Sequence, residues 1–217
     1  SGGAINSPQL LQLSGIGPGA LLQRHNIDVI HESDHVGKNL QDHLGGDNHY
    51  RARVPTLNQE LRPMLGKLKA GMQYVLTRKG PLSLSLNQGG GFVQLDPDAN
   101  GPDLQLYFSP VSYTRAPVGV RPLMNPDPFP GFLIGYNPCK PTSTGHLQIC
   151  SNNPMEPPKI YSNYLDTEYD KKMMLKGVHL IRRIANAPAL QSVIETELTP
   201  GANVKSDTEI AEYIRQK

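Results

Sequence analysis

The sequence predicts an α+β fold in which an antiparallel sheet is backed by helices. Two long stretches, residues 58–79 and 167–186, have the apolar spacing of amphipathic helices. Between them lies a block of short β-type stretches separated by turns rather than by helices, which favours antiparallel pairing. With 217 residues, the chain is long enough for one core, or for one domain and part of a second.

The first seventeen residues predict a tight turn, a short helix and a second tight turn. Gly2 and Gly3 allow the backbone to approach another group closely. Ser7 and Pro8 are typical of a helix cap and a first helical position, so we expect the helix to begin there. The Ser-Gly-Ile-Gly stretch at residues 14–17 is expected to end it.

Three elements are expected before the block of strands. They are a short helix over residues 19–25, a short strand over 28–31 and a long helix over 58–79. The long helix tolerates Pro63 in its first turns, where a missing N–H matters least. Five of its apolar residues form one stripe that we expect to pack against a sheet: Leu61, Leu65, Leu68, Met72 and Val75.

The block of strands is expected to contain a hairpin. Strands are predicted over residues 91–95, 103–108, 131–136, 146–150 and 158–161. The third and fourth should pair around a turn that spans roughly residues 142–146. Cys139 and Cys150 lie nearly symmetrically about that turn, so we expect them directly opposite each other. Reduced thiols are the favoured state, and a cross-strand disulfide is the alternative.

Two helices are expected in the C-terminal quarter. The first covers residues 167–186, and its apolar stripe consists of Met174, Val178, Ile181 and Ala185. The second opens at the capping-box pattern Ser206-Asp207-Thr208-Glu209 and continues to Gln216.

Composition and charge exclude several classes of protein. The net charge of +2 gives no sign of a nucleic-acid-binding surface or of a polybasic membrane patch. No apolar run approaches the roughly 20 residues that span a bilayer. Two cysteines argue against a disulfide-rich secreted scaffold, and a cytoplasmic location is expected. The seven histidines show no metal-ligand spacing, so no metal site is expected.

Two motifs resemble the glucose–methanol–choline (GMC) oxidoreductases, which are flavoenzymes. Gly3-Ala4-Ile5-Asn6-Ser7-Pro8, Leu10-Leu11 and Ser14-Gly15-Ile16-Gly17 are similar to the second signature of that family. Residues 36–43, Val-Gly-Lys-Asn-Leu-Gln-Asp-His, resemble the V-G-x-N-L-x-D-H stretch that follows it. Shorter landmarks in the right order extend the resemblance over nearly the whole chain.

The resemblance implies FAD as the cofactor and a division of the chain. Residues 1–45 would be part of the FAD-binding α/β domain, 46–160 the substrate-binding domain, and 161–217 a helical return toward the FAD-binding domain. The turn Ser1-Gly2-Gly3 would lie against the adenosine–pyrophosphate part of FAD. A strand-to-helix turn that needs glycine for packing explains the same residues equally well.

The octet at 36–43 contains Asn39, Asp42 and His43, which raise the question of an acid–base pair. Neighbours in an extended segment do not face each other. We therefore favour a polar loop that is fixed by bonds from asparagine and aspartate side chains to the backbone.

The resemblance also implies three substrate-binding residues: Gln88, Phe92 and Tyr107. Choline-type members carry a glutamate before A-G-G-F, where this chain reads Gln88-Gly89-Gly90-Gly91-Phe92. Their histidine in the next strand is replaced by Tyr107. Both changes leave neutral hydrogen-bonding groups, so we expect choline to be a poor substrate compared with uncharged alcohols. Phe92 would add an apolar wall, whereas Phe108 alternates toward the sheet core.

The resemblance implies an FAD-dependent dehydrogenase or oxidase that transfers hydride from a CH–OH donor to flavin. The dinucleotide fingerprint and the catalytic histidine of the family lie outside this chain, so we expect no catalytic residue in it and no activity from it alone. Its partners would be a small alcohol and the remainder of the flavoenzyme. Two alternatives stay open: a hydroxynitrile lyase of the same fold, and a non-catalytic binding fragment.

Overall fold

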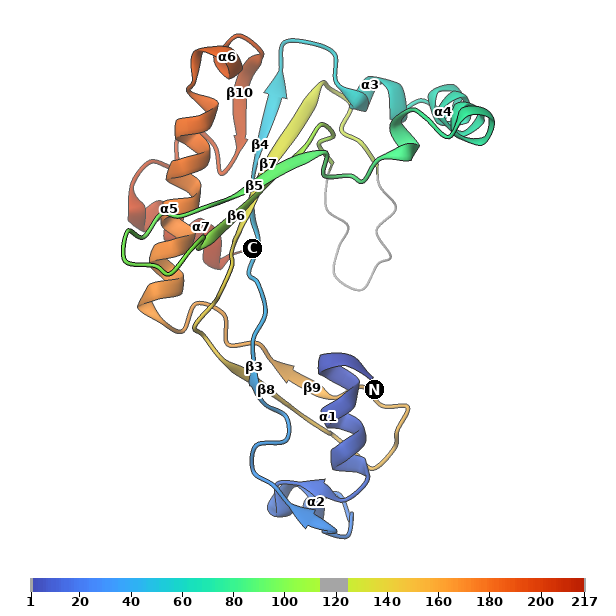
Figure 1. The fold of residues 1–217 in the computed structure, drawn as a ribbon, viewed down its shortest axis with the longest axis vertical. Coiled ribbons are helices and arrows are strands. Elements are labelled where there is room, and N and C mark those ends of the chain that lie inside the picture. Colours follow the sequence, from blue (N-terminus) through green and yellow to red (C-terminus); the bar gives the residue numbers. More distant parts are fainter. Residues whose placement is uncertain (1, 114–124, 217) are drawn as a thin grey trace. The chain divides into compact units, whose positions relative to one another are not determined.

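The computed structural model describes residues 2–113 and 125–216, which form two compact units (Figure 1). Unit 1 consists of Ser1–Leu44 and Lys140–Lys171, and unit 2 consists of Gly45–Cys139 and Lys172–Lys217. The expected domain boundary at residue 45 lies beside the break after Leu44. The remaining boundaries differ, because residues 140–160 group with the N-terminal unit and 172–217 with the larger sheet. The two units are defined by contacts within the chain, whereas the expected domains are defined by the ligand that each would bind. The division into a cofactor domain and a substrate domain therefore stays a prediction.

Among its described residues, unit 1 contains two complete helices and two small sheets. A three-stranded antiparallel sheet has the order β3-β8-β9, and a parallel pair joins β1 to β2. Its elements are α1 (Gly3–Leu13), β1 (Ile16–Gly17), α2 (Gly19–Arg24), β2 (His31–Glu32), β3 (Lys38–Leu40), β8 (Gly145–Gln148) and β9 (Lys159–Tyr161). Leu21, Leu22 and Ile149 form a core cluster, and Leu13 and Ile27 pack against it.

Helix α1 begins earlier than the sequence predicts. It starts at Gly3, so Pro8 lies inside the helix and Ser7 is not its cap. The Ser7 hydroxyl instead accepts a hydrogen bond from the Gly2 N–H at 2.9 Å, which draws the preceding turn onto the helix. The predicted end is confirmed, because the helix stops at Leu13 and Gly15 has a φ of +81°.

The buried side chain of Gln12 joins α1 to the rest of unit 1. Its Oε1 accepts the Ile149 N–H at 2.9 Å, and its Nε2 donates to the Val36 carbonyl at 3.2 Å. Gly37 has a φ of +88°, and a Cβ there would lie 2.2 Å from the Leu147 carbonyl oxygen and 2.7 Å from Gln12 Nε2. The two motifs that resemble the GMC family therefore meet at this junction.

Asp170 is a buried carboxylate that fixes the segment before β8. It accepts the Thr142 N–H at 2.9 Å and the Ser143 N–H at 2.8 Å, and the Thr142 hydroxyl at 3.1 Å. Burial acts to raise the pKa of Asp170, but the hydrogen bonds from Ser143 and Thr142 outweigh it and hold the pKa below its usual value. The ionised carboxylate therefore stabilises this segment.

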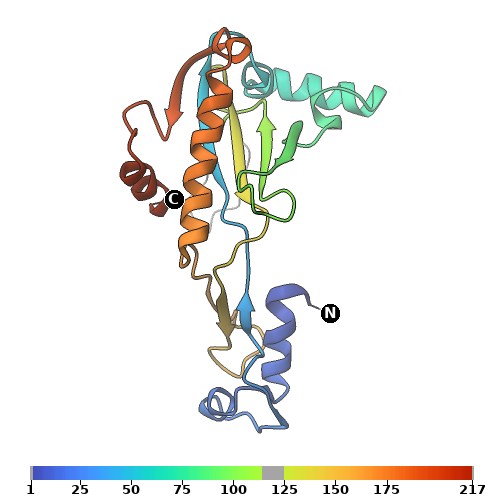
Figure 2. The ribbon, with the colours of Figure 1, turned by 60° about the vertical axis from the view of Figure 1, so that its left-hand side comes forward.

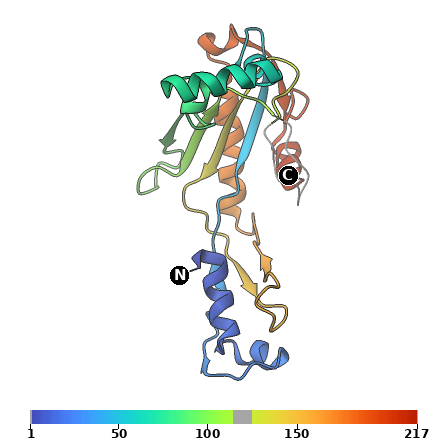
Figure 3. The same cartoon turned by 90° about the vertical axis from the view of Figure 1, so that its right-hand side faces the viewer.

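Unit 2 is built on a five-stranded antiparallel sheet with the order β10-β4-β7-β6-β5. The strands are β4 (Gly46–Ala52), β5 (Gly89–Val93), β6 (Leu104–Ser109), β7 (Gly131–Pro138) and β10 (Ile194–Thr199). Helix α5 (Glu168–Ala185) lies along one face of this sheet, in front of the strands in Figure 2 and behind them in Figure 3. The expected α+β architecture, with helix on antiparallel sheet, is confirmed.

The predicted apolar stripe of α5 is confirmed. Met174, Val178, Ile181 and Ala185 are all buried. The helix approaches β7 closely at Gly177, where a Cβ would lie 2.2 Å from the ring of Tyr136. Burial of this stripe against the strands is the main source of helix stability here, because long helices in proteins depend on packing of an apolar face.

Strand β4 is not predicted by the sequence, although it pairs with both β7 and β10. Its α5-facing positions are Gly46, Asn48, Tyr50 and Ala52, and the last three are buried. Glycine and asparagine at two of these four inward positions interrupt the alternation of apolar and polar residues that identifies a strand. This interruption explains why the sequence does not predict β4.

The expected hairpin between the third and fourth predicted strands is wrong. β7 pairs with β4 and β6 in unit 2, whereas β8 pairs with β3 and β9 in unit 1. The polar residues between them bond to Asp170 instead of closing a tight turn. Cys139 and Cys150 therefore lie in different units and not opposite each other, and both are thiols.

The helix expected over residues 58–79 is two helices, α3 (Leu57–Leu61) and α4 (Met64–Thr77). Thr56 and Gln59 form a capping box at the start of α3, and Pro63 in extended conformation separates the two helices. The stripe expected to pack against a sheet is exposed instead, with Leu65 at 80% and Leu68 at 59% relative exposure. Figures 1 and 2 show α4 extending outward from the sheet.

The end of unit 2 follows the sequence prediction. Ser206 and Glu209 form the expected capping box, and α7 (Asp207–Arg215) buries Ile210 and Ile214. Two short elements complete the unit, η1 (Pro81–Ser83) and α6 (Pro188–Gln191). Throughout residues 2–113 and 125–216, every helix is too short or too polar to cross a bilayer.

Candidate functional site

The register of the unit 2 sheet determines which side chains lie opposite α5. Tyr136 faces α5, because its ring lies against Gly177 of that helix. Successive residues of a strand point to opposite faces, so Gly135 faces the other way. Gly135 pairs with Tyr107 on β6 and with Asp47 on β4. We call this side of the sheet the open face; Figure 3 looks onto it. It carries Asp47, His49, Phe92, Gln105 and Tyr107.

The three residues expected to bind substrate share this open face. Phe92 pairs with Gln105, two residues before Tyr107 on the same strand. The Gln88 N–H donates to the Phe108 carbonyl at 2.9 Å, and continuation of the register places Gln88 on the same side as Phe92. Phe92 is 63% exposed and Gln88 is also exposed, so both are available to a ligand.

Tyr107 owes its position to glycines on two neighbouring strands. A Cβ at Gly135 would lie 1.9 Å from Tyr107 Cε2, so the ring lies directly over this glycine. The Tyr107 hydroxyl donates to the Gly46 carbonyl at 3.5 Å, a long hydrogen bond, and Gly45 also lies beside it. The phenol is therefore held at a fixed place on the sheet while its edge remains accessible.

Phe108 lies on the opposite face, as its alternation predicts. Its ring centroid is 5.5 Å from that of Phe132, which in turn stacks at 5.3 Å on Tyr50. These rings belong to the side of the sheet that α5 covers, which separates Phe108 from the open face.

Asp47 and His49 are open-face residues that sequence reasoning missed. His49 Nε2 lies 3.3 Å from Asp47 Oδ1, and the two side chains are only 14% and 12% exposed. The ring of Tyr113 meets His49 edge-on, with centroids 6.5 Å apart. The signal in the sequence was the Asp-x-His spacing, since alternate residues of a strand share a face. It was overlooked because β4 itself was not predicted.

The expected cofactor turn lies in unit 1, and Ser1 is outside the described residues. At Gly2, a Cβ would lie 2.8 Å from Asn6 Cβ, so packing alone requires glycine. Gly3 has a φ of +74°, and no atom of residues 2–113 or 125–216 lies within 4 Å of the place of its Cβ. Among the same residues, no side chain caps the start of α1, and its first turn holds no acidic residue. Gly2 is thus required by close packing on Asn6, whereas Gly3 is required by its positive φ and faces open space.

The polar octet is only partly the loop favoured from the sequence, because its residues Lys38–Leu40 form strand β3. The Asp42 carboxylate accepts the His43 N–H at 2.9 Å and the Tyr164 hydroxyl. The hydrogen bond to Asp42 raises the pKa of Tyr164, and burial acts in the same direction. Asn39 adopts a φ of +57°, a left-handed conformation that asparagine tolerates. Asp42 therefore fixes the backbone at His43 and the hydroxyl of Tyr164, which is a structural role.

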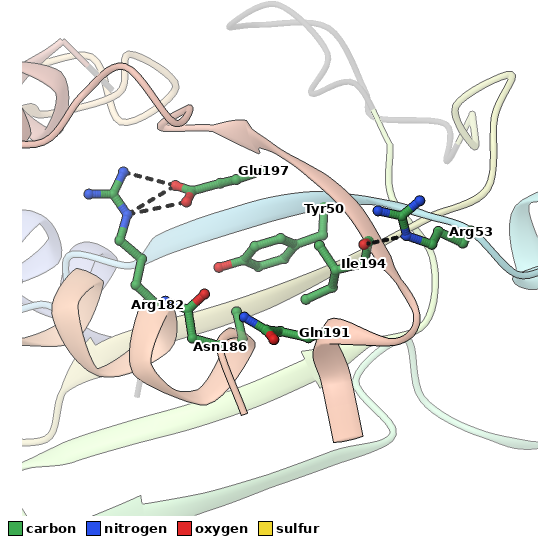
Figure 4. Close-up of a pocket in the computed structure, with 8 residues that line it drawn as sticks. Tyr50, Arg53, Arg182, Asn186, Gln191, Ile194 and Glu197 are labelled. Carbon is green, nitrogen blue, oxygen red and sulfur yellow. Dashed lines mark hydrogen bonds and ion pairs between the residues drawn. The ribbon is translucent and has the colours of Figure 1, made fainter. Parts of the chain in front are cut away.

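A polar cavity lies on the α5 side of the unit 2 sheet (Figure 4). Its volume is about 380 Å³, and Arg182 crosses it to Glu197 with three N–H···O contacts of 3.0 to 3.2 Å. The Tyr50 hydroxyl has no hydrogen-bond partner among the described residues, and burial raises its pKa, assisted by Glu197. A buried hydroxyl without a partner in a polar cavity is a position where an ordered water molecule commonly binds. The cavity faces away from Tyr107, so it is separate from the predicted substrate residues.

A second cavity of about 510 Å³ is mainly apolar and lies near α3 and α6. Phe108, Phe132, Leu57, Leu190 and Val193 contribute to its wall. It belongs to the same sheet face as the first cavity. Among the described residues, no group of three or more His, Cys, Asp or Glu side chains could hold a metal ion.

Comparison with known families and proteins agrees with the motif evidence. Two family models, both described as GMC oxidoreductase, match residues 1–45 and 141–217, which together make up more than half of the chain. Over the whole chain, it is 36% identical to an oxygen-dependent choline dehydrogenase of Staphylococcus xylosus. Over 99% of the chain, it is 34% identical to an alcohol dehydrogenase [acceptor] of Pseudomonas putida. The chain spans 38% of the length of each of these two relatives.

Solved structures show the same fold. A variant of formate oxidase from Aspergillus oryzae superposes with a TM-score of 0.85 over 99% of this chain and 41% of that chain, at 22% identity. Pyridoxine 4-oxidase from Mesorbium loti superposes with a TM-score of 0.75 over 99% of this chain and 37% of that chain, at 24% identity. At these identities the likeness concerns the fold alone.

Proposed function

Because the chain belongs to the GMC oxidoreductase family, we propose that it forms part of the cofactor cradle and the substrate wall of an FAD-dependent enzyme that oxidises a CH–OH donor. The relatives named for choline and for alcohol support a small alcohol as the substrate. Bound FAD would supply the acceptor for hydride from the alcohol carbon. The remainder of the flavoenzyme is the partner that would complete the site.

The start of α1 fits a phosphate-bearing cofactor such as FAD. Backbone N–H groups at a helix N-terminus donate to phosphate oxygens, and the helix dipole favours negative charge there. The absence of a side-chain cap and of acidic residues in the first turn leaves this end of α1 suited to an anion. We assign the contact to Ser1, Gly2 and Gly3. The open space beside Gly3 supports close approach, and Gly2 would act through packing of the turn.

The open face would supply the substrate wall. The single observation that carries this proposal is that Gln88, Phe92 and Tyr107, expected separately from the sequence, lie on one face of one sheet. The Tyr107 hydroxyl and the Gln88 amide would hydrogen-bond to a neutral polar group, and Phe92 would pack on the carbon skeleton and exclude water. The chain's part is to bind and orient the alcohol.

Anaerobic reduction of the flavin tests this proposal. The complete protein would be mixed with a panel of uncharged primary alcohols, and loss of the oxidised flavin absorbance would be followed. We expect at least one alcohol to bleach the flavin. Tyr107→Phe and Phe92→Ala should raise the substrate concentration needed for half-maximal reduction, because both remove contacts on the open face. Tyr161→Phe makes the same chemical change in unit 1 and serves as the matched control.

Two results would contradict the proposal. If flavin binds but stays oxidised with every alcohol, the proposed activity is wrong. If alcohols bleach the flavin but Tyr107→Phe and Phe92→Ala behave like the Tyr161→Phe control, the open face is not the substrate wall.

A further inference from the structure

Helix α4 presents its large apolar side chains away from its own unit. Met64, Leu65, Leu68, Met72, Val75 and Leu76 are all exposed, and we call them the α4 apolar face. Their spacing places them on one side of the helix. An exposed apolar surface of this kind, on a helix with its own polar flanks, marks a site of interaction.

The opposite side of α4 explains this orientation. Ala70 is fully buried there, and a Cβ at Gly66 would lie 1.8 Å from the Glu60 carbonyl oxygen of α3. Small residues therefore let α4 pack against α3 and η1, its main neighbours in unit 2. The large apolar residues have no place in that contact and project outward.

The charge around the α4 apolar face has one sign. Residues 61–95 contain five basic and no acidic residues. The basic residues are Arg62, Lys67, Lys69, Arg78 and Lys79. Lys67 and Lys69 border the apolar side chains on either side of the helix, and Arg78 and Lys79 follow its C-terminus. The whole-chain charge of +2 conceals this cluster, so the expectation that the chain has no polybasic patch is wrong for this segment.

We propose that the α4 apolar face docks on an anionic phospholipid surface, with the helix lying in the headgroup region and not crossing the bilayer. An apolar helix face bordered by lysines is the arrangement that lies at such an interface, because the apolar residues enter the acyl boundary while the lysines reach the phosphates. A second copy of the chain is a poor occupant, because it would bring two clusters of positive charge together.

Vesicle binding by the complete, flavin-loaded protein tests the proposal. Co-flotation would be compared for vesicles of phosphatidylcholine alone and of phosphatidylcholine mixed with phosphatidylglycerol. We expect binding to the anionic vesicles only, and we expect it to weaken as salt rises from about 0.1 M to about 1 M, which shortens the screening length from about 10 Å to about 3 Å. Lys67→Glu with Lys69→Glu should lower the partition coefficient at least about tenfold.

Leu65→Ser with Leu68→Ser should lower partitioning on the same vesicles, because it removes apolar contacts and no charge. Matched controls are Lys159→Glu with Lys172→Glu and, separately, Met155→Ser, which change exposed residues of the same types elsewhere. These controls should bind like the wild type. Flavin content and circular dichroism would establish that each variant is folded.

A fluorescent label at Leu68→Cys distinguishes the other occupants. We expect the label to report water in free protein and an apolar surrounding once anionic vesicles are added, while a label at Met155→Cys should not change. A label at position 68 that is already in an apolar surrounding without vesicles would overturn the proposal in favour of another part of the protein or a second copy. Equal binding to both vesicle types, or no binding by the wild type, would also overturn it.

Discussion

Replacing Gln12 by leucine should open the junction between α1 and the three-stranded sheet of unit 1. The side chain is fully buried and accepts the Ile149 N–H at 2.9 Å while donating to the Val36 carbonyl at 3.2 Å. Leucine has a similar size, so Gln12→Leu creates little empty space but leaves the buried Ile149 N–H and the partly buried Val36 carbonyl without this partner. An unsatisfied buried polar group costs about 1–3 kcal/mol. We expect a local loss of about 2 kcal/mol or more.

Residue-resolved hydrogen exchange on the complete protein measures this loss directly. A change of about 2 kcal/mol in local opening corresponds to roughly thirtyfold faster exchange of the Ile149 amide. Gln9→Leu is the matched control, because Gln9 also lies on α1 but makes a single bond, at 2.8 Å, to the carbonyl of exposed Glu156. Unchanged exchange at Ile149 in Gln12→Leu would refute the assignment of this glutamine as the link between the two motifs.

Three further outcomes are expected. The complete enzyme should show a higher kcat/KM for an uncharged alcohol than for choline. Gln88→Glu should reduce the difference between these two kcat/KM values, because it adds a carboxylate to the open face. A wild-type preference for choline would contradict this reasoning. Gly135→Ala should displace the Tyr107 ring, since the new Cβ would lie 1.9 Å from it, and this should lower kcat/KM by up to about 100-fold. Gly91→Ala is the control and should retain activity, because no atom of the described residues lies within 4 Å of the place of its Cβ. Asp170→Asn should have a lower melting temperature than wild type above about pH 5, and this difference should close as pH falls below about 4. The reason is that a carboxylate with a lowered pKa stabilises the folded state only while it is ionised. A difference in melting temperature that does not depend on pH would show that the charge is unimportant.

Helices α5 and α4 show what periodicity can and cannot predict. Both have an apolar stripe at helical spacing, and the stripe alone predicts a packed face. On α5 this is correct, because the stripe meets the sheet and Gly177 allows close approach to Tyr136. On α4 it is wrong, because Gly66 and Ala70 supply a second, smaller contact surface on the other side. A sequence pattern states that a face is apolar but not what covers it.

The sheet register shows a similar limit. Strand positions along β5, β6 and β7 followed from alternation, but the partner of each strand did not. The predicted hairpin failed because residues after Cys139 carry the chain into another sheet, where Asp170 holds Thr142. The proposed substrate residues Gln88, Phe92 and Tyr107 came from motif position and not from folding physics. Asp47 and His49 could be found only once β4 was known, since their shared face depends on that strand.

Strand β6 places two kinds of residue next to each other in the sequence and on opposite sides of the sheet. Leu104, Leu106 and Phe108 face α5, whereas Gln105 and Tyr107 face outward. Changes at the outward positions leave the packed side untouched, because a layer of backbone separates them. Single substitutions at Gln105 or Tyr107 would therefore change the open face, which we propose as the substrate wall, at little cost in folding. A library confined to Gln105 and Tyr107 would vary the proposed substrate wall while sparing the core, whereas Ser109 at the end of the strand is buried and should be left unchanged.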